Sequence, residues 1–120
     1  MLPKRQRLTS SGVQRVLKKP LRVAVGPFRC SWRENTVGYP RCAVVVTKGT
    51  TVLGSVERNR IRRVVYAALE AAFAQTMMGV DVVIFLRASP EKILTTNILS
   101  HLHSLISSLE EKREAMRNID

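Results

Sequence analysis

Residues 55–63 read Ser-Val-Glu-Arg-Asn-Arg-Ile-Arg-Arg and begin an amphipathic helix. At about 100° per residue, one side of this helix is apolar and the other side carries the charges. The apolar stripe comprises Ile61, Val64, Val65, Ala68 and Ala72, and the polar side comprises Arg58, Asn59, Arg62 and Arg63, with Arg60 at the border.

The apolar stripe can pack on a sheet, which leaves the guanidinium groups outside. Their planar shape suits bidentate contact with phosphate oxygens or guanine edges. A helix face that is merely solvated mixes its charges, whereas Glu57 is the single acid in this stretch. The helix therefore predicts a surface that binds a polyanion.

Charge is distributed unevenly along the chain. Its 120 residues include 20 Lys and Arg against 9 Asp and Glu, a formal net charge of +11. Residues 1–63 hold 15 basic and 2 acidic residues, whereas residues 64–120 hold 5 basic and 7 acidic residues. Such a field favours nucleic acid, because binding neutralises phosphates and releases counterions, and it predicts affinity that falls steeply with salt. A membrane is the weaker alternative, since no stretch approaches the roughly 18 apolar residues of a spanning helix and the basic helix lacks an aromatic anchor.

A chain of this length supports one domain with one modest core, and a hydrophobic content of 45% is normal for a folded protein. We therefore expect a single domain over residues 1–120, with residues from about 111 to 120 forming a frayed tail. Residues 1–7 are basic and lack the apolar run of a secretory signal, which predicts a cytoplasmic location.

The cysteines and histidines do not indicate a metal site. Cys30 and Cys42 are too few for a zinc site and are interpreted as buried, reduced thiols. His101 and His103 lie two residues apart, so on a helix they point away from each other and cannot share a metal ion. No metal-ligating residues are predicted.

Hydrophobic periodicity predicts the element order α-β-β-β-α-β-α. Ser10 or Ser11 is expected to cap the first helix, and Thr95 or Thr96 the last. Gly26 breaks the first extended stretch into two pieces. The Val-rich strand at residues 41–48 is expected in the middle of the sheet, covered on both faces. The expected elements are a helix at 10–19, two strands within 22–32, a turn at 34–40, a strand at 41–48, the arginine helix at 55–78, a strand at 80–86 and a final helix from about 97. This order predicts an α+β sandwich.

The residue types do not support an autonomous nuclease. A protein nuclease that uses two metal ions needs several clustered carboxylates. The basic part of the chain has only Glu34 and Glu57, and Asp81 begins a buried-looking strand. Both histidines lack an evident orienting partner for acid–base chemistry. No catalytic residue is predicted, and the pattern favours a chain that binds nucleic acid without cleaving it.

The run E-R-N-R-I-R-R at residues 57–63 resembles the protein subunit of bacterial ribonuclease P, and the resemblance extends over nearly the whole chain. Arg7-Leu8 followed by Val13 and Val16-Leu17 is similar to the family's R-L and F-x-x-V-F patterns. Residues 42–48 resemble its V-S-K-K strand, and residues 79–84 resemble its G-x-D-I-V-V strand. The chain departs from the family at Val13 and Leu17, where aromatic residues are usual, and at Gly49, where a second lysine is usual.

The resemblance implies a four-stranded sheet with a left-handed β-α-β crossover, against the usual right-handed rule. It also implies a function as the protein component of ribonuclease P, an endonuclease whose RNA subunit removes the 5′ leader of precursor tRNA. The implied cofactor is Mg²⁺, held mainly by the RNA. The implied partners are the ribonuclease P RNA subunit and precursor tRNA, without membrane or DNA.

The main alternative is a structural RNA-binding module such as a ribosomal protein. A DNA-binding regulator is less favoured, because the arginine helix has few side chains suited to adenine or thymine readout.

Two surfaces are expected to contact RNA. By resemblance, the first faces the RNA subunit and comprises Arg58, Asn59, Arg60, Arg62 and Arg63, together with Lys48 as a phosphate contact. The second is the cleft between the first helix and the sheet, which in this family receives the single-stranded leader. Here Phe28 and Trp32 are candidates for stacking bases, with core packing as the alternative for both. Arg15, Arg29 and Arg41 are expected to follow the leader backbone.

Overall fold

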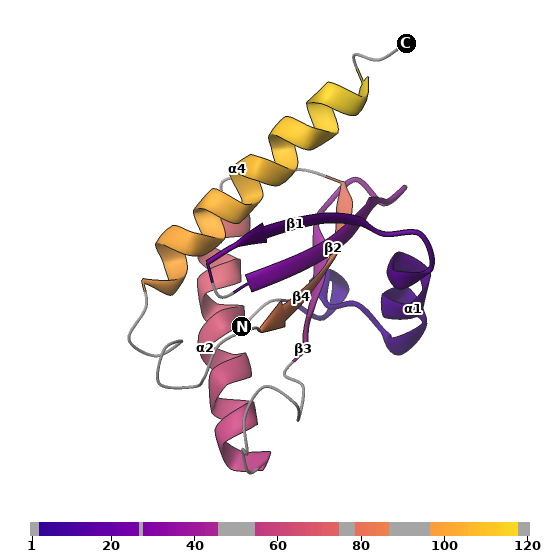
Figure 1. The fold of residues 1–120 in the computed structure, drawn as a ribbon. Helices are drawn as coiled ribbons and strands as arrows, with labels where there is room; N and C mark the ends of the chain where they lie inside the picture. Colours follow the sequence, from indigo (N-terminus) through magenta and orange to yellow (C-terminus); the bar gives the residue numbers. More distant parts are fainter. Residues whose placement is uncertain (1–2, 27, 46–54, 75–78, 87–96, 118–120) are drawn as a thin grey trace.

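The computed structural model describes residues 3–26, 28–45, 55–74, 79–86 and 97–117. It confirms the expected element order and the α+β class (Figure 1). The elements are the 3-10 helix η1 (Lys4–Gln6), α1 (Ser10–Lys18), β1 (Leu21–Val25), β2 (Phe28–Glu34), β3 (Arg41–Val45), α2 (Ser55–Phe73), β4 (Val80–Leu86) and α4 (Ile98–Arg117).

The four strands form one mixed sheet in the order β1-β2-β4-β3. Strands β1, β2 and β4 pair antiparallel, whereas β3 pairs parallel to β4. Because β3 and β4 are parallel, the chain between them makes a crossover connection that contains α2. The left hand of this crossover stays a prediction from the resemblance.

Strand β3 lies at the edge of the sheet, so the expected central position is wrong. Its side chains are nevertheless buried on both faces, which explains the apolar run in the sequence. The backbone of β3 is covered along its outer edge: the Leu8 amide donates to the Cys42 carbonyl at 2.9 Å, and the Val44 amide donates to the Tyr66 hydroxyl at 3.1 Å. A continuous apolar run therefore indicates that both faces of a strand are buried. It does not indicate whether the strand has one neighbouring strand or two.

The core lies between one face of the sheet and helices α2 and α4, and α1 packs on the opposite face against β2 and β4 (Figure 1). On the core face, Phe28, Cys30 and Trp32 alternate along β2 with residues that point the other way. Strand alternation therefore separates a fully apolar face from a second face that α1 covers only in part.

The buried stripes of the two long helices are rotated relative to the expected ones. Helix α2 buries Ile61, Val65, Leu69 and Phe73, at four-residue spacing, whereas Val64 is 36% exposed. For α4, the hydrophobic period predicts a stripe of Ile98, Leu99, Leu102, Leu105, Ile106 and Leu109. Leu99 is instead 41% exposed, and the other five are buried. Each helix contacts the sheet and the other helix at once, which selects a narrower stripe than periodicity alone.

The helix ends also differ from expectation. Thr9 caps α1 instead of Ser10 or Ser11, since its hydroxyl accepts a hydrogen bond from the Gly12 amide at 3.2 Å. The side-chain oxygen of Asn97 accepts a hydrogen bond from the Ser100 amide at 3.1 Å and thereby caps α4. The alternatives Thr95 and Thr96 lie outside the described residues.

Helix α4 continues to Arg117, so the expected fraying from residue 111 is wrong for residues 111–117. Two contacts hold this end against the sheet. Arg113 donates to a Glu34 carboxylate oxygen at 2.8 Å, and the Lys112 ammonium donates to the Arg22 carbonyl at 3.0 Å. The mixed charges that suggested a solvated tail are therefore partly used in tertiary contacts.

Replacing Gly26 with alanine is expected to destabilise the protein more than replacing Gly38. Both glycines have positive φ, 55° and 80°, which costs about 1–2 kcal/mol for a residue with a Cβ. A Cβ at Gly26 would also meet Cδ2 of His101 at 2.2 Å, whereas a Cβ at Gly38 meets nothing within 4 Å. We expect a loss of about 2–4 kcal/mol for Gly26→Ala and about 1–2 kcal/mol for Gly38→Ala in urea unfolding. Gly26→Ala/His101→Ala should recover most of the difference, and equal losses for the two single variants would contradict the clash.

Candidate nucleic-acid interface

The first candidate surface lies on the first turns of α2. We call Arg58, Asn59, Arg60, Arg62 and Arg63 the α2 arginine surface. Arg60 and Arg63 are exposed, and Arg58 and Arg62 are half-buried. The side-chain oxygen of Asn59 accepts a hydrogen bond from Nη1 of Arg62 at 2.7 Å, which orients one guanidinium. Figure 1 shows this end of α2 projecting past the sheet, on the opposite side from the C-terminal end of α4. The structure thus brings the five expected residues together on an accessible helix end.

Arg7 extends this surface onto the N-terminal segment. The pKa of Tyr66 is raised, mainly by burial, while its bond to Val44 and the charges of Arg62 and Arg7 act in the opposite direction. Tyr66 of α2 accepts a hydrogen bond from the Val44 amide of β3, and Arg7 lies along the same strand. An isolated parallel β-bridge pairs the backbone of Arg7 with that of Cys42 in β3. The sequence reasoning did not assign Arg7 to a site, because only the fold brings it beside α2. Lys48, the remaining expected contact, lies outside the described residues.

The second candidate surface is a pocket of about 340 Å³ between α1 and the sheet. We call it the sheet pocket. Its lining residues are Leu17 of α1, Arg22 of β1, Arg29 and Ser31 of β2, and Phe85 of β4. The polar residues alternate with core residues along β1 and β2, and for this reason they face α1 instead of α2 and α4. Arg29 thus lies between α1 and the sheet, while its expected contact with the leader backbone stays a prediction. The other four lining residues were not among the expected site residues.

Phe28 and Trp32 do not line this pocket. Their side chains are 0% and 1% exposed and belong to the core beneath α2 and α4. The expectation that they stack bases is therefore wrong, and the alternative of core packing is correct. Phe85, which lies opposite Arg29 in the β2–β4 register, is the half-exposed aromatic residue that lines the pocket. The sequence could not indicate it, because residues 80–86 are apolar at nearly every position and neither face is distinguished.

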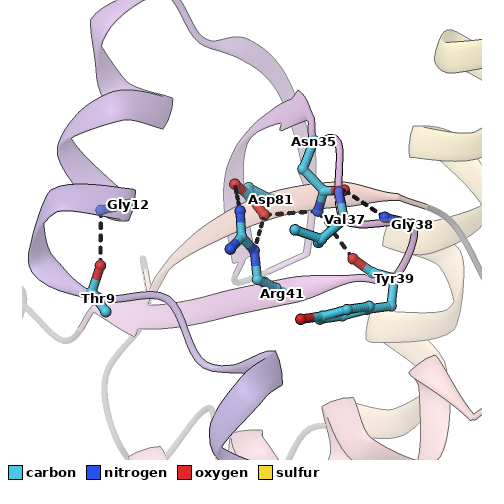
Figure 2. A network of polar contacts seen from close by, with 8 residues as sticks. All are labelled: Thr9, Gly12, Asn35, Val37, Gly38, Tyr39, Arg41 and Asp81. Atoms are coloured by element: carbon cyan, nitrogen blue, oxygen red, sulfur yellow. Dashed lines mark hydrogen bonds and ion pairs between the residues drawn. The ribbon is translucent and has the colours of Figure 1, made fainter.

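Arg41 has a partner within the fold. Its guanidinium binds both carboxylate oxygens of Asp81, each at 2.8 Å, and Asn35 donates to the same carboxylate at 2.9 Å (Figure 2). Asp81 is only 4% exposed, and the hydrogen bond to it raises the pKa of Arg41. The side chain of Asn35 also accepts from the amides of Val37 and Gly38, which ties the turn after β2 to β4. Its charge is balanced in this network, which gives Arg41 a structural role. Its expected contact with the leader backbone stays a prediction.

Arg15 is exposed on the outer side of α1, away from the sheet pocket. It lines a separate, shallow hollow together with Ser11, Gln14 and Lys18 of the same helix. The structure therefore does not bring Arg15 and Arg29 to one site.

The described residues do not form a site for metal-dependent or thiol chemistry. Among them, no three His, Cys, Asp or Glu side chains are grouped so that they could hold a metal ion. Burial raises the pKa of Cys30 to about 12, and it raises the pKa of Cys42 as well, so both thiols stay protonated at neutral pH. Within the described part of the chain, no helix is both long and apolar enough to cross a membrane.

Comparison with known proteins identifies the family. Residues 2–110 match the family model for ribonuclease P. The chain belongs to the ribonuclease P protein family. Membership and fold support a role as a protein component of ribonuclease P in tRNA processing, a role that implies an RNA partner. Among curated proteins, no sequence matches this chain.

The fold of this ribonuclease P family member is similar to solved structures. A Staphylococcus aureus RNase P protein mutant, described as defective in mRNA degradation, superposes with a TM-score of 0.73 at 20% identity, covering 89% of this chain and 90% of that one. The RNase P protein from Thermotoga maritima has a TM-score of 0.70 at 20% identity, covering 88% and 96%. At this identity the likeness establishes the fold, and the site residues must be argued from this chain.

This ribonuclease P family member lacks the aromatic residues usual on the first helix. Val13 is half-buried, and Leu17, which borders the sheet pocket, is 41% exposed. Within the described residues that line the pocket, the aromatic ring comes from the sheet, at Phe85.

Proposed function

We propose that this chain binds the RNA subunit of ribonuclease P through the α2 arginine surface and receives the 5′ leader of precursor tRNA in the sheet pocket. In doing so it promotes the magnesium-dependent endonucleolytic removal of the leader, in the cytoplasm. The observation that carries the proposal is the presence of two separate cationic surfaces, one on a projecting helix end and one in a concave pocket with an aromatic wall. A convex surface suits a folded RNA, and a pocket with a ring suits an unpaired strand.

The chemistry is assigned to the RNA subunit. Two carboxylates near the strand ends form ion pairs within the protein. Asp81, the second residue of β4, pairs with Arg41, and Glu34, the last residue of β2, pairs with Arg113. The described residues therefore do not fit a magnesium site, and we assign the metal ions to the RNA. The contribution of the protein is electrostatic. Fixed guanidinium groups between RNA strands reduce the repulsion of their phosphates, so that fewer metal ions are needed to hold substrate and RNA subunit together.

The test is a cleavage assay with precursor tRNA and a bacterial ribonuclease P RNA at low magnesium, with and without this protein. We expect the 5′ leader to be released faster only when both components are present, and the stimulation to shrink as magnesium or monovalent salt is raised. The protein alone serves as the control and is expected to be inactive. Salt-dependent RNA binding without stimulation would favour the alternative, a structural RNA-binding module, and cleavage by the protein alone would overturn the division of labour.

A further inference from the structure

The two edges of the sheet use their backbone groups differently. The edge formed by β3 is hydrogen-bonded to the N-terminal segment and to α2, whereas β1 forms the opposite edge. The Arg22 carbonyl points away from β2, because it accepts a hydrogen bond from the Lys112 ammonium at 3.0 Å. Outward and inward residues alternate in an antiparallel ladder, so the backbone of Ala24 also points outward.

Three backbone groups on the β1 edge have no hydrogen-bond partner among the residues that the structure describes. They are the amides of Arg22 and Ala24 and the carbonyl of Ala24, and both residues are exposed. A row of unpaired N–H and C=O groups is a template for a further strand. A second peptide backbone supplies acceptors and donors at the same spacing, whereas a sugar-phosphate backbone has no N–H groups. The β1 edge therefore fits a peptide better than RNA.

The surroundings of the β1 edge are cationic. Arg22 is exposed, and Arg29, which lies opposite Ala24 in the β1–β2 register, is exposed as well. Neither has an ionic partner within the described part of the chain, and Lys112 adds a third cation from α4. A second copy of the chain carries a net charge of +11 and would be repelled here. An acidic partner would find complementary charge.

The two faces of β1 determine the side chains that an added strand should carry. Residues opposite Arg22 and Ala24 would point to the open face, beside the arginines. Their neighbours would point to the core side of β1, where α4 packs. On that side Leu21 and Val25 are only half-buried, so apolar side chains would extend their contacts. The fitting segment is extended and alternates acidic with apolar residues.

We propose that the β1 edge binds an acidic peptide segment of a partner protein as a fifth strand of the sheet. Its acidic side chains lie beside Arg22, and its apolar side chains contact Leu21 and Val25. Lys112 occupies the position of one strand hydrogen bond in the free protein. On binding, a peptide N–H takes over the Arg22 carbonyl, and the ammonium pairs with a carboxylate of the peptide. Neither the RNA subunit nor the leader takes part, so this binding is independent of the proposed function.

The test uses the full chain and a blocked synthetic peptide of the sequence Glu-Val-Glu-Val-Glu-Val-Glu. Amide hydrogen exchange, followed by NMR, reports on the edge residue by residue. We expect the peptide to slow exchange of the Arg22 and Ala24 amides by about 10-fold or more at saturation. The Val23 amide, which already faces β2, should change little and serves as the internal control. A peptide with Lys in place of Glu should not bind.

N-methylated peptides test the hydrogen bonds without altering the protein. In an added strand, alternate N–H groups face β1 and the others face solvent. Methylation of either the Val or the Glu amides should therefore raise Kd by about 10-fold or more, while methylation of the other set should change it by less than about 2-fold. The set that weakens binding reports whether the peptide lies parallel or antiparallel to β1.

Ala24→Pro removes an outward N–H from the protein and leaves the bonds between β1 and β2 in place. We expect Kd for the peptide to rise about 10-fold, with Ala24→Val, which keeps the N–H, as the matched control. Urea unfolding establishes that each variant is folded. If Ala24→Pro does not fold, the methylated peptides decide the question by themselves.

Three outcomes would overturn the proposal. Equal weakening by both methylated peptides, or an unchanged Kd for folded Ala24→Pro, would mean that charge alone attracts the peptide. Protection of the Arg22 and Ala24 amides by raised protein concentration would assign the edge to a second copy of the chain. Protection of the same amides by a single-stranded RNA, without protection by the peptide, would assign the edge to RNA.

Discussion

Replacing Arg60 and Arg63 together with alanine is expected to weaken binding of the ribonuclease P RNA subunit by about 2–4 kcal/mol, a factor of roughly 30 to 1000 in Kd. Both side chains are exposed on α2, so each guanidinium lost removes a phosphate or guanine contact without opening the core. The measurement is the Kd of the protein–RNA complex over a series of salt concentrations. The slope of log K against log salt should fall by about 0.7–0.9 for each phosphate contact removed.

Lys112→Ala is the control for this experiment, because it removes an exposed cation at the far end of α4 and should leave Kd for the RNA subunit nearly unchanged. Arg62→Ala is informative in another way. It removes the partner of Asn59, so its effect combines a lost RNA contact with a less ordered neighbour. If the double variant unfolds while RNA binding per folded molecule stays the same, the α2 arginine surface is structural and the assignment fails.

Replacing Arg41 with alanine is expected to lower the free energy of unfolding by about 2–4 kcal/mol. The substitution leaves the Asp81 carboxylate buried beside β2 with Asn35 as its remaining partner, and a buried charge without its counter-charge is strongly unfavourable. We place the value somewhat below that of a fully buried pair, because the Arg41 side chain is 24% exposed. Urea unfolding of the isolated protein measures the loss.

Two further variants separate the ion pair from its position on the sheet face. Arg41→Met/Asp81→Leu replaces both charges with apolar groups and should recover most of the lost stability. Arg29→Ala removes an exposed cation from the same face and should change stability by less than about 0.5 kcal/mol. If Arg41→Ala instead keeps its stability and loses discrimination between precursor and mature tRNA, Arg41 binds the leader after all and the structural assignment is wrong.

The elements of the fold follow from local patterns, and the sheet order does not. The 3.6-residue period predicted where α2 and α4 begin to within a few residues, and Gly26 marked the break between β1 and β2. The position of β3 depends on which strands meet in space. A strand such as β3, covered on both faces by helices and by the N-terminal segment, has the same sequence pattern as a central strand. The cap of α1 was missed for a local reason, since Thr9, Ser10 and Ser11 all carry a suitable hydroxyl.

The sequence predicted the part of the candidate site that consists of clustered charges. It did not predict which strand residues line the pocket, because that depends on which face of the sheet the helices cover. The arginines of α2 stand out in the sequence because they are consecutive. The alternation of β2 correctly placed Phe28 and Trp32 on one face, but alternation does not say which face the helices cover. Because the helices cover the face that carries Phe28 and Trp32, these two residues lie in the core. The opposite face, with Ser31 of β2 and Phe85 of β4, lines the pocket instead. The structural partner of Arg41 was not predictable, because Asp81, forty residues later in the chain, pairs with it only in the fold.

The covered edge of β3 has a consequence for the protein inside a ribonucleoprotein. A net charge of +11 keeps copies of the free chain apart, but RNA neutralises that charge and removes the repulsion. Copies gathered along one RNA would then be at risk of strand-to-strand aggregation through an open sheet edge. At Cys42 and Val44 the backbone groups of that edge are already bonded, to Leu8 and to Tyr66. These hydrogen bonds do not depend on the net charge of the protein, so neutralisation of that charge would leave this part of the edge covered.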